Sequence, residues 1–327
     1  MNSRRNELVN LIENKVVTSD NIDEAVVVAD ILPDTPRWLA FLNQLCLWAG
    51  SIALSLAVLF FIAFNWSAFG KFGKFILLET SIVIAVGAFL WVKKSTLLAK
   101  ASITVASILV GVLLALFGQT YQTGADPWQL FLVWACFIIP WAIASRFSVL
   151  LLMSTILINV SLLLYSSIHA SILSSILGFD VYFVWDVFVL NLFLLVAWHM
   201  AHEKLTWIKD GFSIRCVALI VALAMNMLVN MSLTETGTVI SWSAAIWVFC
   251  LGFGYWFYRY KYVDLFMLAI GCLSAIGIIT VFFIEVLMQR HDTVDLFPFL
   301  TIIVMGLGAA AIGWLKKVQK DIHNASE

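Results

Sequence analysis

Long apolar segments separated by short polar ones dominate the sequence after about residue 43. Each segment is close to the roughly 20 residues that carry a helix across about 30 Å of hydrocarbon. A spanning segment must satisfy its own backbone hydrogen bonds, so we expect helices. The predicted spans are 44–64, 75–92, 101–118, 128–145, 147–166, 182–200, 213–232, 238–258, 264–287 and 296–315. The pattern predicts an all-α, polytopic integral membrane protein of about ten transmembrane helices.

The polar segment before the first span has its own periodicity. Apolar residues recur at i, i+3 and i+4 in 7–16 and again in 22–32, as in amphipathic helices. We therefore predict a short cytoplasmic helical hairpin at 1–35, a ten-helix transmembrane domain at 36–316 and a cytoplasmic tail at 317–327. The least distinct boundary is that between the fourth and fifth spans, where a single arginine, Arg146, divides two apolar runs.

Basic residues predict the orientation of these helices. With the N-terminus placed in the cytoplasm, the inner segments hold 16 of the 19 Lys and Arg residues and the outer loops hold 3. This split agrees with the positive-inside rule and predicts that both termini are cytoplasmic. Two of the exceptions, Lys71 and Lys74, flank the start of the second span, where we expect their ammonium groups to reach up to the lipid headgroups.

Composition excludes several classes of function. Hydrophobic residues make up 62% of the chain and charged residues 12%, whereas soluble domains are about half apolar and a quarter charged. The expected partner is therefore the lipid bilayer, and a net charge of −1 gives no reason to expect nucleic acid. The five cysteines lie in apolar runs and the five histidines are scattered, so we expect no metal and no cofactor. No catalytic motif is present, so no catalytic residue is predicted.

Polar residues within the spans gather in the half that faces outward in this orientation. The second span carries Glu79 about one turn from its outer end, and the sixth carries Asp186 at a similar depth. The outer loop 119–128 has many hydrogen-bonding groups and no Lys or Arg. Ionisable groups at such depths are costly and commonly functional, although a carboxylate near a helix end can also simply reach water. The residues predicted to line an outward-facing polar site are Glu79, Gln119, Tyr121, Gln122, Asp126 and Asp186.

Four asparagines occupy the middle or outer half of the spans. They are Asn159, Asn191, Asn226 and Asn230. Each can serve a polar site, but the simpler interpretation is a hydrogen bond between neighbouring helices, worth about 1 kcal/mol or less.

Two short motifs resemble a known family. The first is Phe64-Asn65-Trp66, directly after the first span, and the second is Gly118-Gln119-Thr120-Tyr121-Gln122, which a Trp-rich span beginning at Trp128 follows. Together they resemble the bacterial membrane protein family named domain of unknown function 2157, over roughly residues 5–150. The resemblance implies a bacterial inner-membrane location and brings no activity. It marks Asn65, Trp66, Gly118 and Trp128 as signature positions, together with Gln119, Tyr121 and Gln122.

Three functions remain open at this stage. The first is binding or transport of a small polar or cationic solute, or of a lipid-linked headgroup, at the outward-facing site. The second is a non-catalytic scaffold or subunit that holds a membrane or cytoplasmic protein partner. The third, an intramembrane enzyme, is the least favoured because no motif supports it.

Overall fold

The chain folds into helices, as the apolar pattern predicts. A computed structural model describes residues 8, 11–12, 16–18, 21–28, 35–93, 96–177, 182–209, 211–236, 242–288 and 296–324. These residues are 89% helical and include no strand. They divide into two compact units, Met1–Leu116 and Phe117–Glu327.

The first unit holds the polar N-terminal segment and the first spans. Its helices are α2 (Ile22–Val28), α3 (Thr35–Phe64), α4 (Lys71–Trp91) and the greater part of α5 (Leu97–Tyr121). In the predicted hairpin, α2 forms part of the second helix. Most of the first predicted helix, 7–16, lies outside the described residues, so the hairpin stays a prediction.

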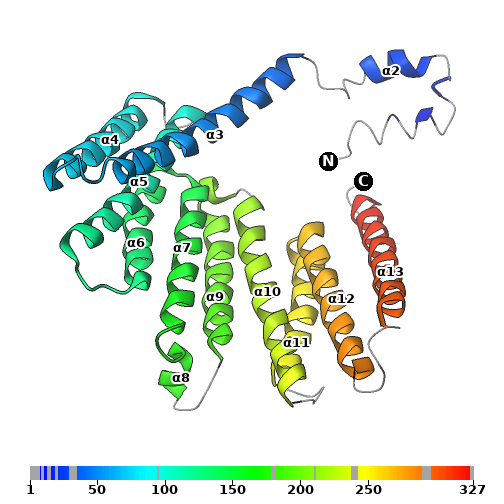
Figure 1. Cartoon of the computed structure of the whole chain (residues 1–327). Helices are drawn as coiled ribbons and strands as arrows, with labels where there is room; N and C mark the ends of the chain where they lie inside the picture. The colour runs from blue at the N-terminus through cyan, green and yellow to red at the C-terminus, as the bar shows by residue number, and fades with distance from the viewer. Residues whose placement is uncertain are drawn as a thin grey trace. The chain divides into compact units, whose positions relative to one another are not determined.

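The second unit is a row of helices in which sequence neighbours pack against one another. Its elements are α6 (Pro127–Ser145), α7 (Ser148–Ser166), α8 (Ile172–Leu177), α9 (Phe183–Lys204), η2 (Thr206–Ile208), α10 (Gly211–Thr236), α11 (Trp242–Trp256), η3 (Phe257–Lys261), α12 (Leu265–Met288) and α13 (Leu296–Asn324). Packed pairs run in the order α6–α7, α7–α9, α9–α10, α10–α12 and α12–α13, and α11 contacts both α10 and α12 (Figure 1).

The prediction of a multi-spanning membrane protein is confirmed. Within the described residues, nine helices are long and apolar enough to cross a membrane. The remaining predicted span, 238–258, coincides with α11 and the π-helical turn η3, which together cover Trp242–Lys261. Its α-helical part has 15 residues, which is short for a span on its own, and residues 237–241 lie outside the described part of the chain.

The tightest connection in the second unit is the α6–α7 turn. Arg146 adopts a left-handed conformation, with φ at 52°, and its N–H donates to the carbonyl of Ile143. The N–H of Phe147 donates to the carbonyl of Ala142 at 3.2 Å. This pair of bonds is a Schellman motif, which ends α6 and lets α7 begin at once. The predicted boundary at Arg146 is therefore a helix reversal.

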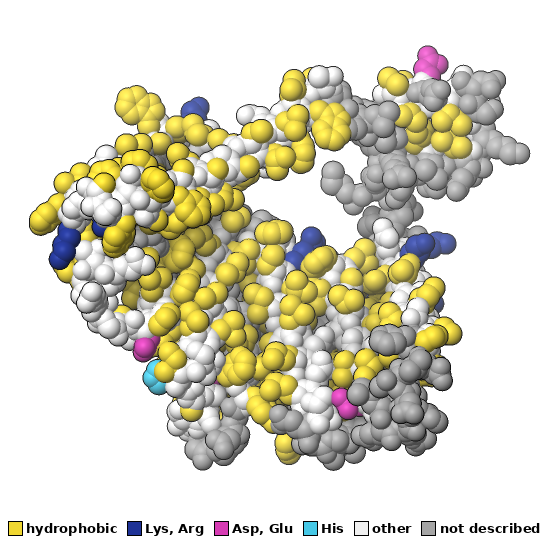
Figure 2. All heavy atoms as spheres, in the orientation of Figure 1, with side chains coloured by type: hydrophobic (Ala, Val, Ile, Leu, Met, Phe, Trp, Pro, Cys, Tyr) yellow, Lys and Arg dark blue, Asp and Glu magenta, His cyan; other side chains and the backbone are white. Residues whose placement is uncertain are grey.

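The basic side chains of the second unit gather at one of its two ends. The basic end holds Lys204, Lys209, Arg215, Arg259 and Lys261. On the face in Figure 2, the Lys and Arg side chains of this unit lie at that end, and acidic and histidine side chains lie at the opposite one. The separation is the one that the positive-inside count requires, while the side of the membrane on which each end lies stays a prediction.

Candidate functional site

The sequence-predicted residues of the second unit lie at the end opposite to the basic end. We call it the loop end; it comprises residues 117–130, 161–177 and 182–188. One set of contacts links its elements: the Ser161 hydroxyl, on α7, donates to the Trp128 carbonyl on α6 at 2.8 Å. The rings of Trp128 and Tyr165 meet edge to face with centroids 5.2 Å apart. The start of α6 and the end of α7 are therefore fixed to each other.

The motif Gly118–Gln122 is a helix stop. The N–H of Thr123 donates to the carbonyl of Gly118 at 3.4 Å, and Gln122 between them has a φ of 45°. These are features of a Schellman-type end, here with a glutamine in the left-handed position that glycine usually takes. Gln119, Tyr121 and Gln122 are exposed around this turn. Their side chains are thus displayed at the loop end rather than used in the core.

Asp126 occupies the N-cap position of α6 but does not cap it. Its side chain makes no hydrogen bond to the helix backbone. One carboxylate oxygen instead accepts a hydrogen bond from the Trp128 indole N–H at 3.3 Å. Behind the indole, Tyr165 stacks on His169 with a centroid distance of 4.5 Å and an interplanar angle of 10°. A partly exposed carboxylate therefore contacts the edge of the first of three aromatic rings in a row.

Asp186, also predicted to line the site, is buried in the first turn of α9. Its side chain is 6% exposed, and its two oxygens accept the backbone N–H groups of Ile172 at 2.8 Å and Leu173 at 2.9 Å. A separate bond in the same turn joins Ser171 and Ser174: the Ser171 hydroxyl accepts the N–H of Ser174 at 3.3 Å. Asp186 thus fastens the start of α8 to α9. The structure records no contact between Asp186 and the rings of Trp128, Tyr165 or His169.

Glu79 belongs to the first unit and is described within it. It is exposed on α4 and makes no hydrogen bond or ion pair with another described residue. Its place in a site with the loop end stays a prediction.

The signature residues after α3 have structural tasks. The Asn65 side-chain amide donates to the Phe61 carbonyl at 2.9 Å, at the end of the helix. The Trp66 ring lies under the Lys74 ammonium, 3.4 Å from the ring centroid. Lys74 is only 7% exposed, so it does not extend freely to the headgroups as expected; a cation–π contact accommodates its charge instead.

The asparagine pair at mid-depth confirms the simpler interpretation. The side chains of Asn159 on α7 and Asn191 on α9 bond to each other in both directions, at 3.0 and 2.6 Å. Each amide also donates to the carbonyl four residues earlier, of Thr155 and Val187. The pair satisfies itself and leaves no group for a ligand.

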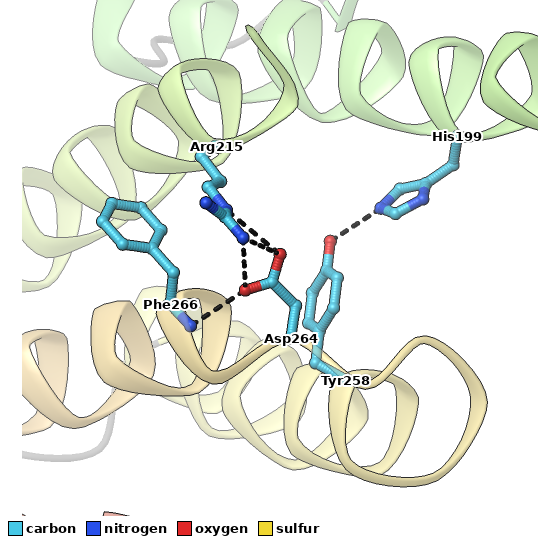
Figure 3. A network of polar contacts seen from close by, with 5 residues as sticks. All are labelled: His199, Arg215, Tyr258, Asp264 and Phe266. Carbon is cyan, nitrogen blue, oxygen red and sulfur yellow. Dashed lines mark hydrogen bonds and ion pairs between the residues drawn. The ribbon is translucent and has the colours of Figure 1, made fainter. Parts of the chain in front are cut away.

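Sequence reasoning missed a polar network at the basic end (Figure 3). The ring of His199, on α9, faces the Tyr258 hydroxyl of η3 with 2.8 Å between Nε2 and the oxygen. Arg215 of α10 donates to both carboxylate oxygens of Asp264, at 3.1 and 3.3 Å. Asp264 also accepts the Phe266 N–H at 2.9 Å and so caps α12. The network joins the ends of four elements around a hollow of about 200 Å³.

Only weak signals in the sequence could have pointed to this network. Its partners are far apart along the chain: 59 residues separate His199 from Tyr258, and 49 separate Arg215 from Asp264. Within the described residues, no group of three or more His, Cys, Asp or Glu could hold a metal ion. We interpret the network as a fastening of helix ends, in which the partly exposed ion pair contributes about 1 kcal/mol or less.

Comparison with known proteins supports the predicted resemblance. Residues 34–168 match the family described as "Predicted membrane protein (DUF2157)". The matched segment contains Glu79, the turn at Gly118–Gln122, Asp126 and Trp128, and it ends before Asp186. No curated protein and no solved structure matches the chain. The family description supports a membrane location and names no activity.

Proposed function

We propose that this protein binds an ammonium group, carried by a lipid headgroup or by a small polar amine, at the loop end. The observation that carries the proposal is the Asp126 carboxylate, which stands at a helix N-cap, is not used to cap the helix and contacts the edge of the Trp128 indole, the first ring of the Trp128–Tyr165–His169 row. A carboxylate and aromatic faces together are the groups that recognise organic ammonium ions.

The electrostatic setting favours a cation. Arg146 is the only Lys or Arg from residue 101 to 203, and it lies in the α6–α7 turn, away from the loop end. Asp186 is engaged with α8, so its charge adds to the local potential without needing to touch a ligand. A site with carboxylates and no Lys or Arg side chain attracts cations from solution.

The exposed residues around Asp126 have supporting roles in this proposal. Gln119 and Gln122 offer amide oxygens to the N–H groups of an amine, and Tyr121 offers a hydroxyl and a ring. Glu79 would join them only if α4 of the first unit approaches the loop end. We further propose a bacterial inner-membrane location with both termini cytoplasmic. The distribution of basic residues supports this orientation, which places the loop end on the side of the membrane away from the cytoplasm.

The experiment compares ligands that differ in the ammonium group alone. The full chain in nanodiscs is titrated with phosphatidylethanolamine and with phosphatidylglycerol, and separately with free ethanolamine, to distinguish the two sources of the group. The variant is Asp126→Asn. Its matched control is Glu24→Gln, which removes an exposed carboxylate from α2.

We expect wild type and Glu24→Gln to prefer the ammonium ligand, and Asp126→Asn to bind it about tenfold more weakly, equivalent to about 1.4 kcal/mol. Equal affinity of wild type for the two lipids, together with no binding of ethanolamine, would overturn the proposal. So would full binding by Asp126→Asn.

A second candidate, a scaffold that holds a protein partner, is favoured by α13. Of its described side chains only Val318 is buried. No atom lies within 4 Å of a Cβ built on Gly306 or Gly313. Small residues on an open helix face commonly pack against another helix in a membrane. A subunit retained by wild type and lost from Gly306→Leu would favour this function over ligand binding.

A further inference from the structure

A groove between α10, α12 and α13 shares no lining residue with the basic-end hollow and includes no residue of the loop end. Its volume is about 360 Å³. Leu223 of α10, Leu273 of α12 and Val304 of α13 supply aliphatic walls, and Asn226 and Ser274 are among its few polar residues. Asn226 lies near the middle of α10, so the groove opens at the depth of the hydrocarbon.

The amide of Asn226 is only half satisfied. Its carbonyl oxygen accepts the Ser274 hydroxyl at 2.5 Å, and that hydroxyl accepts the Trp247 indole N–H at 2.9 Å. Its NH₂ group donates to no described residue. Asn159 and Asn191 differ, because each of their NH₂ groups donates to a backbone carbonyl and to the partner amide.

Gly277 leaves the Asn226 amide open to the groove. A Cβ built on Gly277 would lie 3.7 Å from the Asn226 nitrogen, so a larger side chain there would cover it. The other hydroxyl in the groove, that of Thr280, donates to the Ile276 carbonyl at 2.7 Å and is used within its own helix. The groove therefore presents one prominent hydrogen-bond donor group among apolar walls.

An unpartnered donor at this depth indicates the chemistry of its ligand. An amide N–H without an acceptor in an apolar medium costs a few kcal/mol, and the hydrocarbon supplies little water to satisfy it. None of the described residues that line the groove is Lys, Arg, Asp or Glu, so the acceptor that suits it is uncharged.

The dimensions of the groove favour a single extended alkyl chain as its occupant. Along α12 its lining extends from Ile270 to Thr280, which is about 15 Å at 1.5 Å per residue. A second helix is about 10 Å across, too thick for this volume.

We propose that this groove binds a linear apolar molecule that carries an uncharged carbonyl, of the ketone or ester class. The carbonyl oxygen accepts the hydrogen bond from the Asn226 NH₂ group, and the alkyl chain lies along α10 and α12. This ligand is unrelated to the ammonium group of the proposed function.

The test uses two probes that differ only in the oxygen: hexadecan-2-one labelled with ¹³C at its carbonyl, and hexadecane. Protein-containing and empty nanodiscs are loaded with both probes, and retention is measured after repurification. The carbonyl ¹³C resonance reports hydrogen bonding directly. The variants are Asn226→Leu, which removes the donor, and Gly277→Leu, which fills the groove. The control is Thr280→Val, which changes another residue of the groove lining and keeps the Asn226 donor.

We expect wild type and Thr280→Val to retain the ketone over the alkane by about 2- to 13-fold, the ratio for a hydrogen bond worth about 0.5–1.5 kcal/mol. Asn226→Leu should retain both probes equally, and Gly277→Leu should retain neither. Asp126→Asn should behave like wild type here, which separates this proposal from the ammonium site.

Several outcomes would overturn the proposal: no preference in wild type, an unchanged preference in Asn226→Leu, or a preference that survives Gly277→Leu. If Asn226→Leu does not fold, two other results decide the question. These are the preference of wild type for the ketone together with its ¹³C shift, and the loss of both in Gly277→Leu.

Discussion

Asp186 offers the sharpest test of how the loop end is built. Replacement by Asn keeps the size of the side chain and removes one of its two acceptor oxygens. One backbone N–H, of Ile172 or Leu173, would then face an NH₂ group instead of an oxygen 2.8–2.9 Å away. A hydrogen bond to a charged group contributes about 1.5–3 kcal/mol, so the contact that holds α8 should weaken by about 2–3 kcal/mol.

The assay is amide hydrogen exchange in nanodiscs, read residue by residue over α8. A loss of about 2–3 kcal/mol corresponds to exchange about 30- to 150-fold faster, if the amides exchange through local opening. Asp126→Asn is the matched control, because that carboxylate makes no bond to the backbone of its helix and the first turn of α6 should keep its protection. Unchanged protection of Ile172 and Leu173 in Asp186→Asn would refute this account of Asp186.

Two further predictions concern the helix packing of the second unit. Arg146→Gly should raise the free energy of unfolding by up to about 1 kcal/mol, because the left-handed conformation at φ 52° is strained for a residue other than glycine. Arg146→Ala should leave the free energy of unfolding unchanged. If equilibrium unfolding shows the glycine variant to be less stable than the alanine variant, the prediction is wrong. In a double-mutant cycle of Asn159→Leu and Asn191→Leu, we expect a coupling energy between about 0.6 and 1.7 kcal/mol; additive effects of the two substitutions would show that the reciprocal hydrogen bonds contribute nothing.

The helices could be predicted because the bilayer imposes a length and a composition on every span. The ends were harder to predict wherever a helix continues into water. The structure starts α3 at Thr35 and ends α13 at Asn324, beyond the predicted limits of 44 and 315. At the end of α13 the added residues are mostly polar, so hydropathy alone does not detect them. At Arg146 the single charged residue was the right boundary, because a Schellman turn needs few residues.

The site residues were less predictable, and Asp186 shows why. Its depth and charge were visible in the sequence, but its partners are backbone amides 13 and 14 residues earlier, which only the path of the chain brings to it. Asn159 and Asn191, which are 32 residues apart, could be assigned to helix contacts in general terms but not to each other. The role of a polar group at helix depth therefore depends on its neighbour in space.

The α6–α7 turn has a consequence for how the chain enters the membrane. The side of α7 that packs inward carries polar groups among its leucines, including Ser154, Thr155 and Asn159, and each of these three donates to a carbonyl within α7 itself. Alone in lipid, α7 would expose that side to hydrocarbon. Because Arg146 and Phe147 form the whole connection, α6 emerges from the ribosome immediately before α7 and can cover part of it as soon as it is made. The two helices would then insert together as one hairpin, and a longer linker would expose α7 to lipid and to membrane quality control.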